Sequence, residues 1–163
     1  MMTAIIIDDE TYSCETLTML LARYCPRVHV IAVCNSGADA LKEIHAQKPQ
    51  LVFLDIEMPH MNGFELLEQL TEINFELIFT TSYDQYAIKA IRFSALDYLL
   101  KPIDREELVR AVEKAVQKQQ RPFQQQLEIL LQKLQQPSAS ILKIALPTMD
   151  GLQMIPVDSI ISC

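Results

Sequence analysis

The sequence predicts an α/β fold in which five parallel strands form a doubly wound sheet covered by five helices. Short apolar segments alternate with segments whose apolar residues recur at helical spacing, which is typical of βα units. The apolar segments are almost continuous, as in strands buried on both faces. Half of the 163 residues are apolar, so the chain is long enough to bury a core.

The strands are expected where β-branched and aromatic residues cluster. They are residues 3–8 (TAIIID), 28–33 (VHVIAV), 51–55 (LVFLD), 77–81 (LIFTT) and 97–100 (DYLL).

The helices are expected between and after these strands, where apolar stripes occur. The stripes are Leu17, Leu20, Leu21 and Tyr24; Leu66, Leu67, Leu70 and Ile73; and Leu108, Val112 and Ala115. Ser36 with Asp39 and Asp104 with Glu107 have the spacing of N-cap signals for the second and fifth helices. The first domain is therefore placed at residues 1–118.

The composition changes after the fifth helix, because residues 117–140 contain nine glutamines and two prolines but no glycine. We therefore predict a linker at residues 119–140. Leu127, Leu130, Leu131 and Leu134 favour a short amphipathic helix between Pro122 and Pro137. That helix could pair with a second copy of the chain or pack on the first domain, and the sequence leaves both open.

Residues 141–163 return to a β-like pattern, with a hairpin turn signal at Asp150-Gly151. Twenty-three residues cannot bury a core alone, so we expect the beginning of a second domain that is cut short.

The composition limits the possible functions. The net charge is −7, and no basic face obvious enough to bind nucleic acid is present. No apolar segment approaches the length of a membrane span, and no signal peptide is indicated, so we expect no membrane insertion. The four cysteines have no metal-binding spacing, which favours reduced thiols in the cytoplasm.

Polar residues follow the predicted strands at their carboxyl ends, where doubly wound sheets bind ligands. Asp8 and Asp9 close the first strand, Asp55 the third, Thr81 the fourth, and Lys101 follows the fifth. In the flavodoxin-like strand order 2-1-3-4-5 the first and third strands are neighbours, so the three aspartates should meet.

Three carboxylates around one crevice repel each other unless a cation neutralises them, and they suit Mg²⁺. A divalent metal beside a strand-end carboxylate also suits phosphoryl transfer to an aspartate nucleophile, for which Asp55 is the best candidate. Thr81 and Lys101 could bind the phosphoryl oxygens.

The segments IIIDDE, LVFLDIEMPHMNG, FTTSYD and DYLLKPI, in this order, resemble the receiver domain of bacterial two-component response regulators over residues 1 to about 118. The resemblance implies that Asp55 accepts a phosphoryl group from a sensor histidine kinase. It also implies Mg²⁺ bound directly by Asp9 and Asp55, through water by Asp8, and by the backbone carbonyl of Glu57.

The resemblance also implies roles for other residues that match the receiver motifs. Lys101 would bind the phosphoryl group, and the Lys101-Pro102 bond would be cis. Thr81 and Tyr98 would form a switch pair that alters the surface of the fourth helix, fifth strand and fifth helix. Pro59 and Gly63 would shape the loop after Asp55.

The segments TTSYDQYAIKAI and SALDYLLKPI resemble receivers of the LytTR class in particular, although Ile91 replaces a frequent phenylalanine. Residues 141–163 are similar to the first strands of the LytTR DNA-binding domain. The class implies a transcription regulator that dimerises on activation and binds DNA through a domain largely missing from this sequence.

Two other function classes compete with this interpretation. A haloacid dehalogenase-type phosphatase would also use an aspartyl phosphate and Mg²⁺, but it usually has a second aspartate where Glu57 stands. An interaction module with a receiver-like fold but no phosphorylation should have lost an acidic-pocket residue, and none is lost. With three glycines, the chain has no glycine-rich loop for a flavin or dinucleotide.

Overall fold

The computed structural model describes residues 1–135. The chain divides into two compact units, Met1–Lys118 and Gln119–Cys163. The expected hairpin at Asp150-Gly151, and the segment 141–163 that resembles a second domain, lie outside the described residues.

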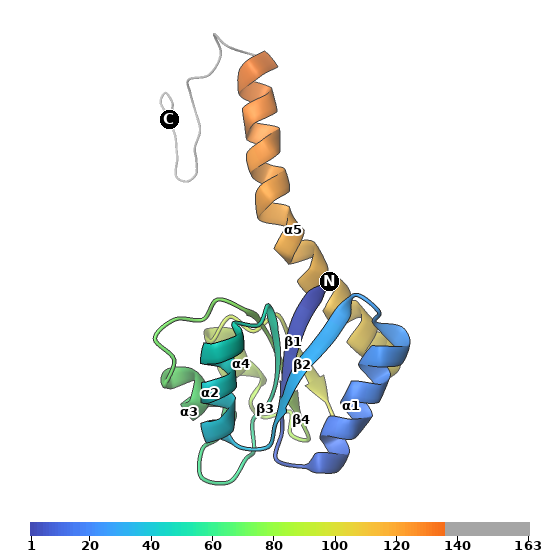
Figure 1. Cartoon of the computed structure of the whole chain (residues 1–163), viewed down its shortest axis with the longest axis vertical. Helices are drawn as coiled ribbons and strands as arrows, with labels where there is room; N and C mark the ends of the chain where they lie inside the picture. The colour runs from blue at the N-terminus through green and yellow to red at the C-terminus, as the bar shows by residue number, and fades with distance from the viewer. Residues whose placement is uncertain (136–163) are drawn as a thin grey trace. The chain divides into compact units, whose positions relative to one another are not determined.

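The first unit contains a parallel five-stranded sheet of order β2-β1-β3-β4-β5, which confirms the predicted topology (Figure 1). Each strand begins and ends within one residue of its predicted bounds. The strands are β1 (Met2–Ile7), β2 (Val28–Cys34), β3 (Leu51–Asp55), β4 (Glu76–Thr81) and β5 (Asp97–Leu100). The helices are α1 (Thr11–Tyr24), α2 (Gly37–Gln47), α3 (Gly63–Glu68), α4 (Ala87–Arg92) and α5 (Arg105–Gln135).

Helices cover both faces of the sheet, with α1 and the first part of α5 on one face and α2, α3 and α4 on the other (Figure 1). All five residues of β3 are buried. Phe53 belongs to the core under α1 and α5, whereas Val52 and Leu54 belong to the core on the opposite face. Burial on both faces explains why this strand has no alternating polar residues.

Side-chain caps fix where several helices begin. Ser36 accepts a hydrogen bond from the backbone N–H of Asp39 (3.2 Å), and Asp104 accepts one from that of Glu107 (3.0 Å), which confirms both predicted caps. A reciprocal capping box between Asn62 and Glu65 begins α3 directly after the loop that follows Asp55. That loop is therefore held at both of its ends.

The third helix is shorter than the apolar pattern predicts. It ends at Glu68, so Leu70 and Ile73 lie outside it. Leu70 still packs partly against the core, whereas Ile73 is exposed. Thr71 and Asn74 have low helix propensity, which explains why the helix stops before the stripe does.

The fifth helix is longer than predicted. The sequence predicts a separate short helix between Pro122 and Pro137, but α5 continues through Pro122 to Gln135. An interior proline removes one intrahelical hydrogen bond and crowds the carbonyl four residues before it, at a cost of about 3 kcal/mol, but the surrounding glutamine, lysine and leucine residues are good helix formers. Within residues 1–135 no helix is both long and apolar enough to span a membrane.

Candidate functional site

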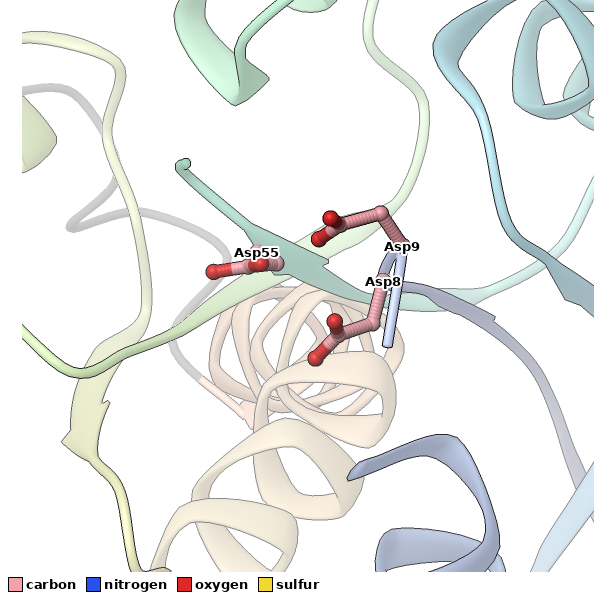
Figure 2. A group of neighbouring side chains, drawn as sticks. All are labelled: Asp8, Asp9 and Asp55. Carbon is pink, nitrogen blue, oxygen red and sulfur yellow. The ribbon is translucent and has the colours of Figure 1, made fainter. Parts of the chain in front are cut away.

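Three aspartates meet at the carboxyl edge of the sheet, as the strand order predicts (Figure 2). Asp8 and Asp9 directly follow β1, and Asp55 is the last residue of β3. Because β1 and β3 are adjacent and parallel, with Ile7 opposite Leu54, their ends coincide. One carboxylate oxygen from each aspartate lies within 4.8 Å of the other two.

Lys101 brings the nearest positive charge to this cluster. Its Nζ lies 2.6 Å from Oδ2 of Asp8, 3.7 Å from Oδ2 of Asp55 and 3.7 Å from Oε1 of Glu10. Its backbone N–H donates to the carbonyl of Thr81 (2.7 Å), which fixes the lysine to the end of β4. The Lys101-Pro102 peptide bond is cis, the isomer that the resemblance implies.

Negative charge exceeds positive charge in this buried site. Asp8 is 3% exposed and Asp55 4% exposed. Burial, followed by the charge of Asp8, raises the pKa of Asp55 to about 7, although Lys101 acts in the opposite direction. Burial alone would lower the pKa of Lys101, but the hydrogen bond to Asp8 and the charge of Asp55 hold it above its usual value. One ammonium therefore does not neutralise the cluster.

The backbone of Asp8 is held by two side chains that the sequence alone does not single out as site residues. The amide of Asn35 donates to the Asp8 carbonyl (2.9 Å), and so does the thiol of Cys14 (3.3 Å). Burial, followed by the charge of Asp8, raises the pKa of Cys14 to about 11, so this thiol stays protonated at neutral pH. Cys14 therefore acts as a hydrogen-bond donor that positions Asp8.

The loop after Asp55 is shaped by a close approach of backbone atoms. A Cβ atom at Gly63 would lie 2.8 Å from the carbonyl oxygen of Asp55, so no larger residue fits without movement. The N–H of Gly63 donates to the Ile56 carbonyl (2.9 Å), and the N–H of Met61 donates to the Pro59 carbonyl (2.7 Å). These bonds fold the loop back over the end of β3.

The side chain of Glu57 does not join the aspartate cluster. It is exposed, and its carboxylate accepts a hydrogen bond from the hydroxyl of Tyr86, which directly precedes α4. The Tyr86 ring also contacts Phe64 of α3 edge-on, with centroids 6.0 Å apart. Tyr86 therefore links the loop after Asp55 to the beginning of α4, a link that no sequence motif indicates because 29 residues separate the partners.

Thr81 and Tyr98 both contact Tyr83. Thr81 is completely buried, and its hydroxyl oxygen accepts a hydrogen bond from the N–H of Tyr83 (3.3 Å). The half-buried Tyr98 donates its hydroxyl to the carbonyl of Tyr83, and its ring centroid lies 6.4 Å from that of Phe79. The segment after β4 therefore connects the two residues, with Ser82 exposed beside Thr81.

The donor set fits a divalent cation. Each aspartate offers an oxygen to one small volume, and carboxylate oxygens are the ligands that Mg²⁺ prefers. A bound dication would also offset the negative charge that Lys101 leaves uncompensated. The side chains of Asp8, Asp9 and Asp55 are thus the residues that could hold it.

The chain is similar to a known family and to several known proteins. Residues 4–113 match the response regulator receiver domain. An uncharacterized response regulatory protein of Vibrio cholerae is 44% identical over 115 residues, covering 70% of this chain and 48% of that protein. The sensory transduction protein LytT of Bacillus anthracis is 34% identical over 163 residues, covering 99% of this chain and 65% of LytT. The chain thus spans between about half and two thirds of the length of these relatives.

Solved structures agree with the sequence comparison. The REC domain of AraT, a response regulator from Geobacillus stearothermophilus, is 30% identical with a TM-score of 0.67, covering 74% of this chain and 97% of that one. The response regulatory domain of mrkE from Klebsiella pneumoniae is 25% identical with a TM-score of 0.66, covering 72% and 97%. The family model, the relatives and the fold therefore agree, and the chain belongs to the response regulator receiver family, in the class that contains the LytT proteins.

Proposed function

We propose that this chain is a phosphorylation-controlled switch of a bacterial two-component system, in which Asp55 accepts a phosphoryl group from a sensor histidine kinase. The position of Asp55 carries the proposal. Its carboxylate ends a buried strand, shares one small volume with Asp8 and Asp9, and lies 3.7 Å from the Lys101 ammonium. Such a site suits phosphoryl transfer, which depends mainly on positioning and charge neutralisation.

The transfer exchanges one bond to phosphorus for another. The bond between phosphorus and the kinase histidine nitrogen breaks, its electron pair stays on the imidazole, which takes up a proton, and a carboxylate oxygen of Asp55 bonds to phosphorus. Asp55 must be ionised to attack, and the Lys101 ammonium favours that form. A Mg²⁺ ion held by Asp8, Asp9, Asp55 and the carbonyl of Glu57 would neutralise charge on the phosphoryl oxygens.

After phosphorylation, rearranged contacts of the chain's own residues change the surface of the protein. Lys101 shifts from its carboxylate partners to a phosphoryl oxygen, and the Thr81 hydroxyl turns toward the same group. Thr81 then no longer accepts the hydrogen bond from the N–H of Tyr83. This loosens the segment around Tyr83, so that the hydrogen bond from Tyr98 to the Tyr83 carbonyl breaks and Tyr98 turns inward. The contacts through Tyr83 support this coupling, which biases an existing equilibrium of the α4-β5-α5 face.

We infer that the output is regulatory rather than catalytic. In the proposal, the altered face promotes homodimerisation, and a C-terminal domain binds DNA to control transcription. The similarity to LytT proteins over nearly the whole chain supports this assignment. A phosphatase is less well supported, because Glu57 points its carboxylate to Tyr86 rather than to the aspartates.

The test is the intact mass of the protein after incubation with acetyl phosphate, in Mg²⁺ or in EDTA. We expect one phosphoryl addition that needs Mg²⁺, is absent in Asp55→Ala and is slowed in Asp9→Ala. Asp39→Ala, which removes an exposed aspartate on α2, is the matched control and should react as the wild type does. If the wild type gains no phosphoryl group from acetyl phosphate or from a panel of phosphorylated kinases, the chain is an interaction module with a receiver fold.

A further inference from the structure

Glu57 is the carboxylate closest in sequence to Asp55, and its side chain stays outside the aspartate cluster. Its backbone is anchored, because the neighbouring side chains of Ile56 and Met58 are buried in the core. The Glu57 side chain itself is exposed. The Cα atoms of residues two apart are separated by at most about 7 Å, a distance that a glutamate side chain can span. Rotation of this one side chain could therefore bring a fourth carboxylate to the cluster.

Tyr86 holds the Glu57 side chain in its outward position. The Tyr86 hydroxyl donates a hydrogen bond to Oε2 of Glu57. The Tyr86 ring is oriented in turn by edge-on contacts with Phe64 and Tyr83, whose ring centroids lie 6.0 Å and 6.4 Å from its own. The hydrogen bond to Glu57 also raises the pKa of Tyr86, so the phenol keeps its proton and remains a donor at neutral pH. Two aromatic contacts thus direct one hydroxyl at one carboxylate.

The charge of Glu57 is not neutralised by a neighbouring cation. Where side chains are described, the ion pairs of the chain all join lysines to other carboxylates. Asp8 and Asp9 are the carboxylates that act most strongly on the pKa of Asp55. A Glu57 carboxylate released from Tyr86 would add a further full negative charge to this site, which already has too many.

We propose that Tyr86 is a positioning residue of the phosphorylation site, which holds the Glu57 carboxylate away from Asp55 and keeps the approach of a phosphoryl group free of a further negative charge. The inference rests on the proposed role of Asp55 as phosphoryl acceptor. Release of Glu57 would act in opposite directions on the two ligands of the site. The freed carboxylate would attract Mg²⁺ and repel the negatively charged phosphodonor.

Calorimetric titration with Mg²⁺, without a phosphodonor, tests the first effect. Tyr86→Phe keeps the ring and its aromatic contacts but removes the hydroxyl that holds Glu57. A carboxylate that moves a few ångströms toward a dication, to about 4–5 Å, strengthens its binding about fourfold even at the dielectric constant of water. Tyr86→Phe should therefore bind Mg²⁺ about fourfold more tightly than the wild type. A merely structural role of Tyr86 would loosen the loop and weaken Mg²⁺ binding, so weaker or unchanged binding would overturn the proposal.

The rate of phosphorylation tests the second effect. Intact mass is followed over time with acetyl phosphate at saturating Mg²⁺, so that a difference in metal affinity does not contribute. Tyr86→Phe should gain the phosphoryl group about fourfold more slowly than the wild type, because the freed carboxylate repels the incoming dianion. Tighter Mg²⁺ binding together with slower phosphorylation is the expected signature, and a rate equal to or above that of the wild type would contradict the proposal.

Removing the charge of Glu57 provides the decisive control. In a Glu57→Gln background, Tyr86→Phe should change neither Mg²⁺ binding nor the phosphorylation rate, because no charge is released. Glu68→Gln removes an exposed carboxylate on α3 instead and should leave both effects of Tyr86→Phe in place. Effects that persist in Glu57→Gln would mean that Tyr86 acts through the packing of α4, and would overturn the proposal. A wild type that is never phosphorylated would refute the proposed function, whereas the Mg²⁺ titration would still decide the role of Tyr86.

Discussion

The metal-free protein should become more stable when Asp55 is replaced by asparagine, which keeps the size of the side chain and removes its charge. Burial and the charge of Asp8 raise the pKa of Asp55 from 3.8 to about 7 in the folded protein. Between these two pH values the folded protein binds more protons than the unfolded chain. The free energy of unfolding of the wild type therefore falls as the pH rises from about 4 to about 7, and stays low above that.

The size of the effect follows from the shift. Roughly three pKa units correspond to about 4 kcal/mol at about 1.4 kcal/mol per unit. At pH 5 Asp55 is still mostly protonated in the folded protein, so only part of this destabilisation is present, and the same pKa values give about 2 kcal/mol. We therefore expect the free energy of unfolding of Asp55→Asn to exceed that of the wild type by about 4 kcal/mol at pH 8 and by about 2 kcal/mol at pH 5.

Urea denaturation followed by far-ultraviolet circular dichroism, in EDTA at four pH values from 5 to 8, measures this difference. Glu68→Gln removes an exposed carboxylate on α3 and should match the wild type throughout. Millimolar Mg²⁺ should narrow the gap by stabilising the wild type more than the variant. No gap at pH 8, or a gap that shrinks as the pH rises, would refute the reasoning and mean that Lys101 already neutralises Asp55.

Three further substitutions test separate parts of the site. Lys101→Ala leaves Asp8 and Asp55 without their ammonium, so urea denaturation in EDTA at pH 8 should show a loss of about 3 kcal/mol, smaller at pH 5 and partly reversed by Mg²⁺. Gly63→Ala places a methyl group against the Asp55 carbonyl, so calorimetry should show a loss of about 1–3 kcal/mol, with a lower yield of phosphorylated protein by intact mass. Asn62→Ala breaks the capping box and should cost about 1 kcal/mol at every pH, since no titrating site group is removed.

The sequence predicts the aspartate cluster well because topology alone brings it together. Once β1 and β3 are assigned as adjacent parallel strands, the residues at their ends must meet, whatever the side chains around them do. Asp8, Asp9 and Asp55 therefore follow from strand order. The same reasoning places Thr81 and Lys101 at the same edge of the sheet.

The contacts that hold the cluster do not follow from strand order. Cys14 lies on α1 and Asn35 follows β2, and both donate to the carbonyl of Asp8, beside which the Asn35 amide also donates to the Cys14 sulfur (3.6 Å). The link between Tyr86 and Glu57 likewise depends on how α4 packs beside the loop after Asp55. These contacts depend on side-chain geometry after packing, and spacing along the chain carries no signal for them.

The ends of α3 and α5 show where local patterns mislead in opposite directions. An apolar stripe suggested a longer α3, but Leu70 can contact the core without being helical. Pro122 predicts a helix boundary, but its cost of about 3 kcal/mol is local, and good helix formers on both sides continue the helix to 31 residues. An apolar stripe indicates which residues are buried, and a proline indicates a local loss of helix stability. Neither alone decides where a helix ends.

The instability of the site and its proposed function have the same origin. Asp55, the proposed nucleophile, is held, buried, beside Asp8 and within reach of Lys101, and the same burial and charge make its ionised form costly in the metal-free protein. A site built only for stability would carry a neutral residue there. A cation that relieves the excess negative charge binds more favourably in proportion to that cost. The wild type retains the cost, whereas Asp55→Asn has lost it. The pH-dependent gap between the two proteins is therefore a measure of the free energy that the site makes available for binding a cation.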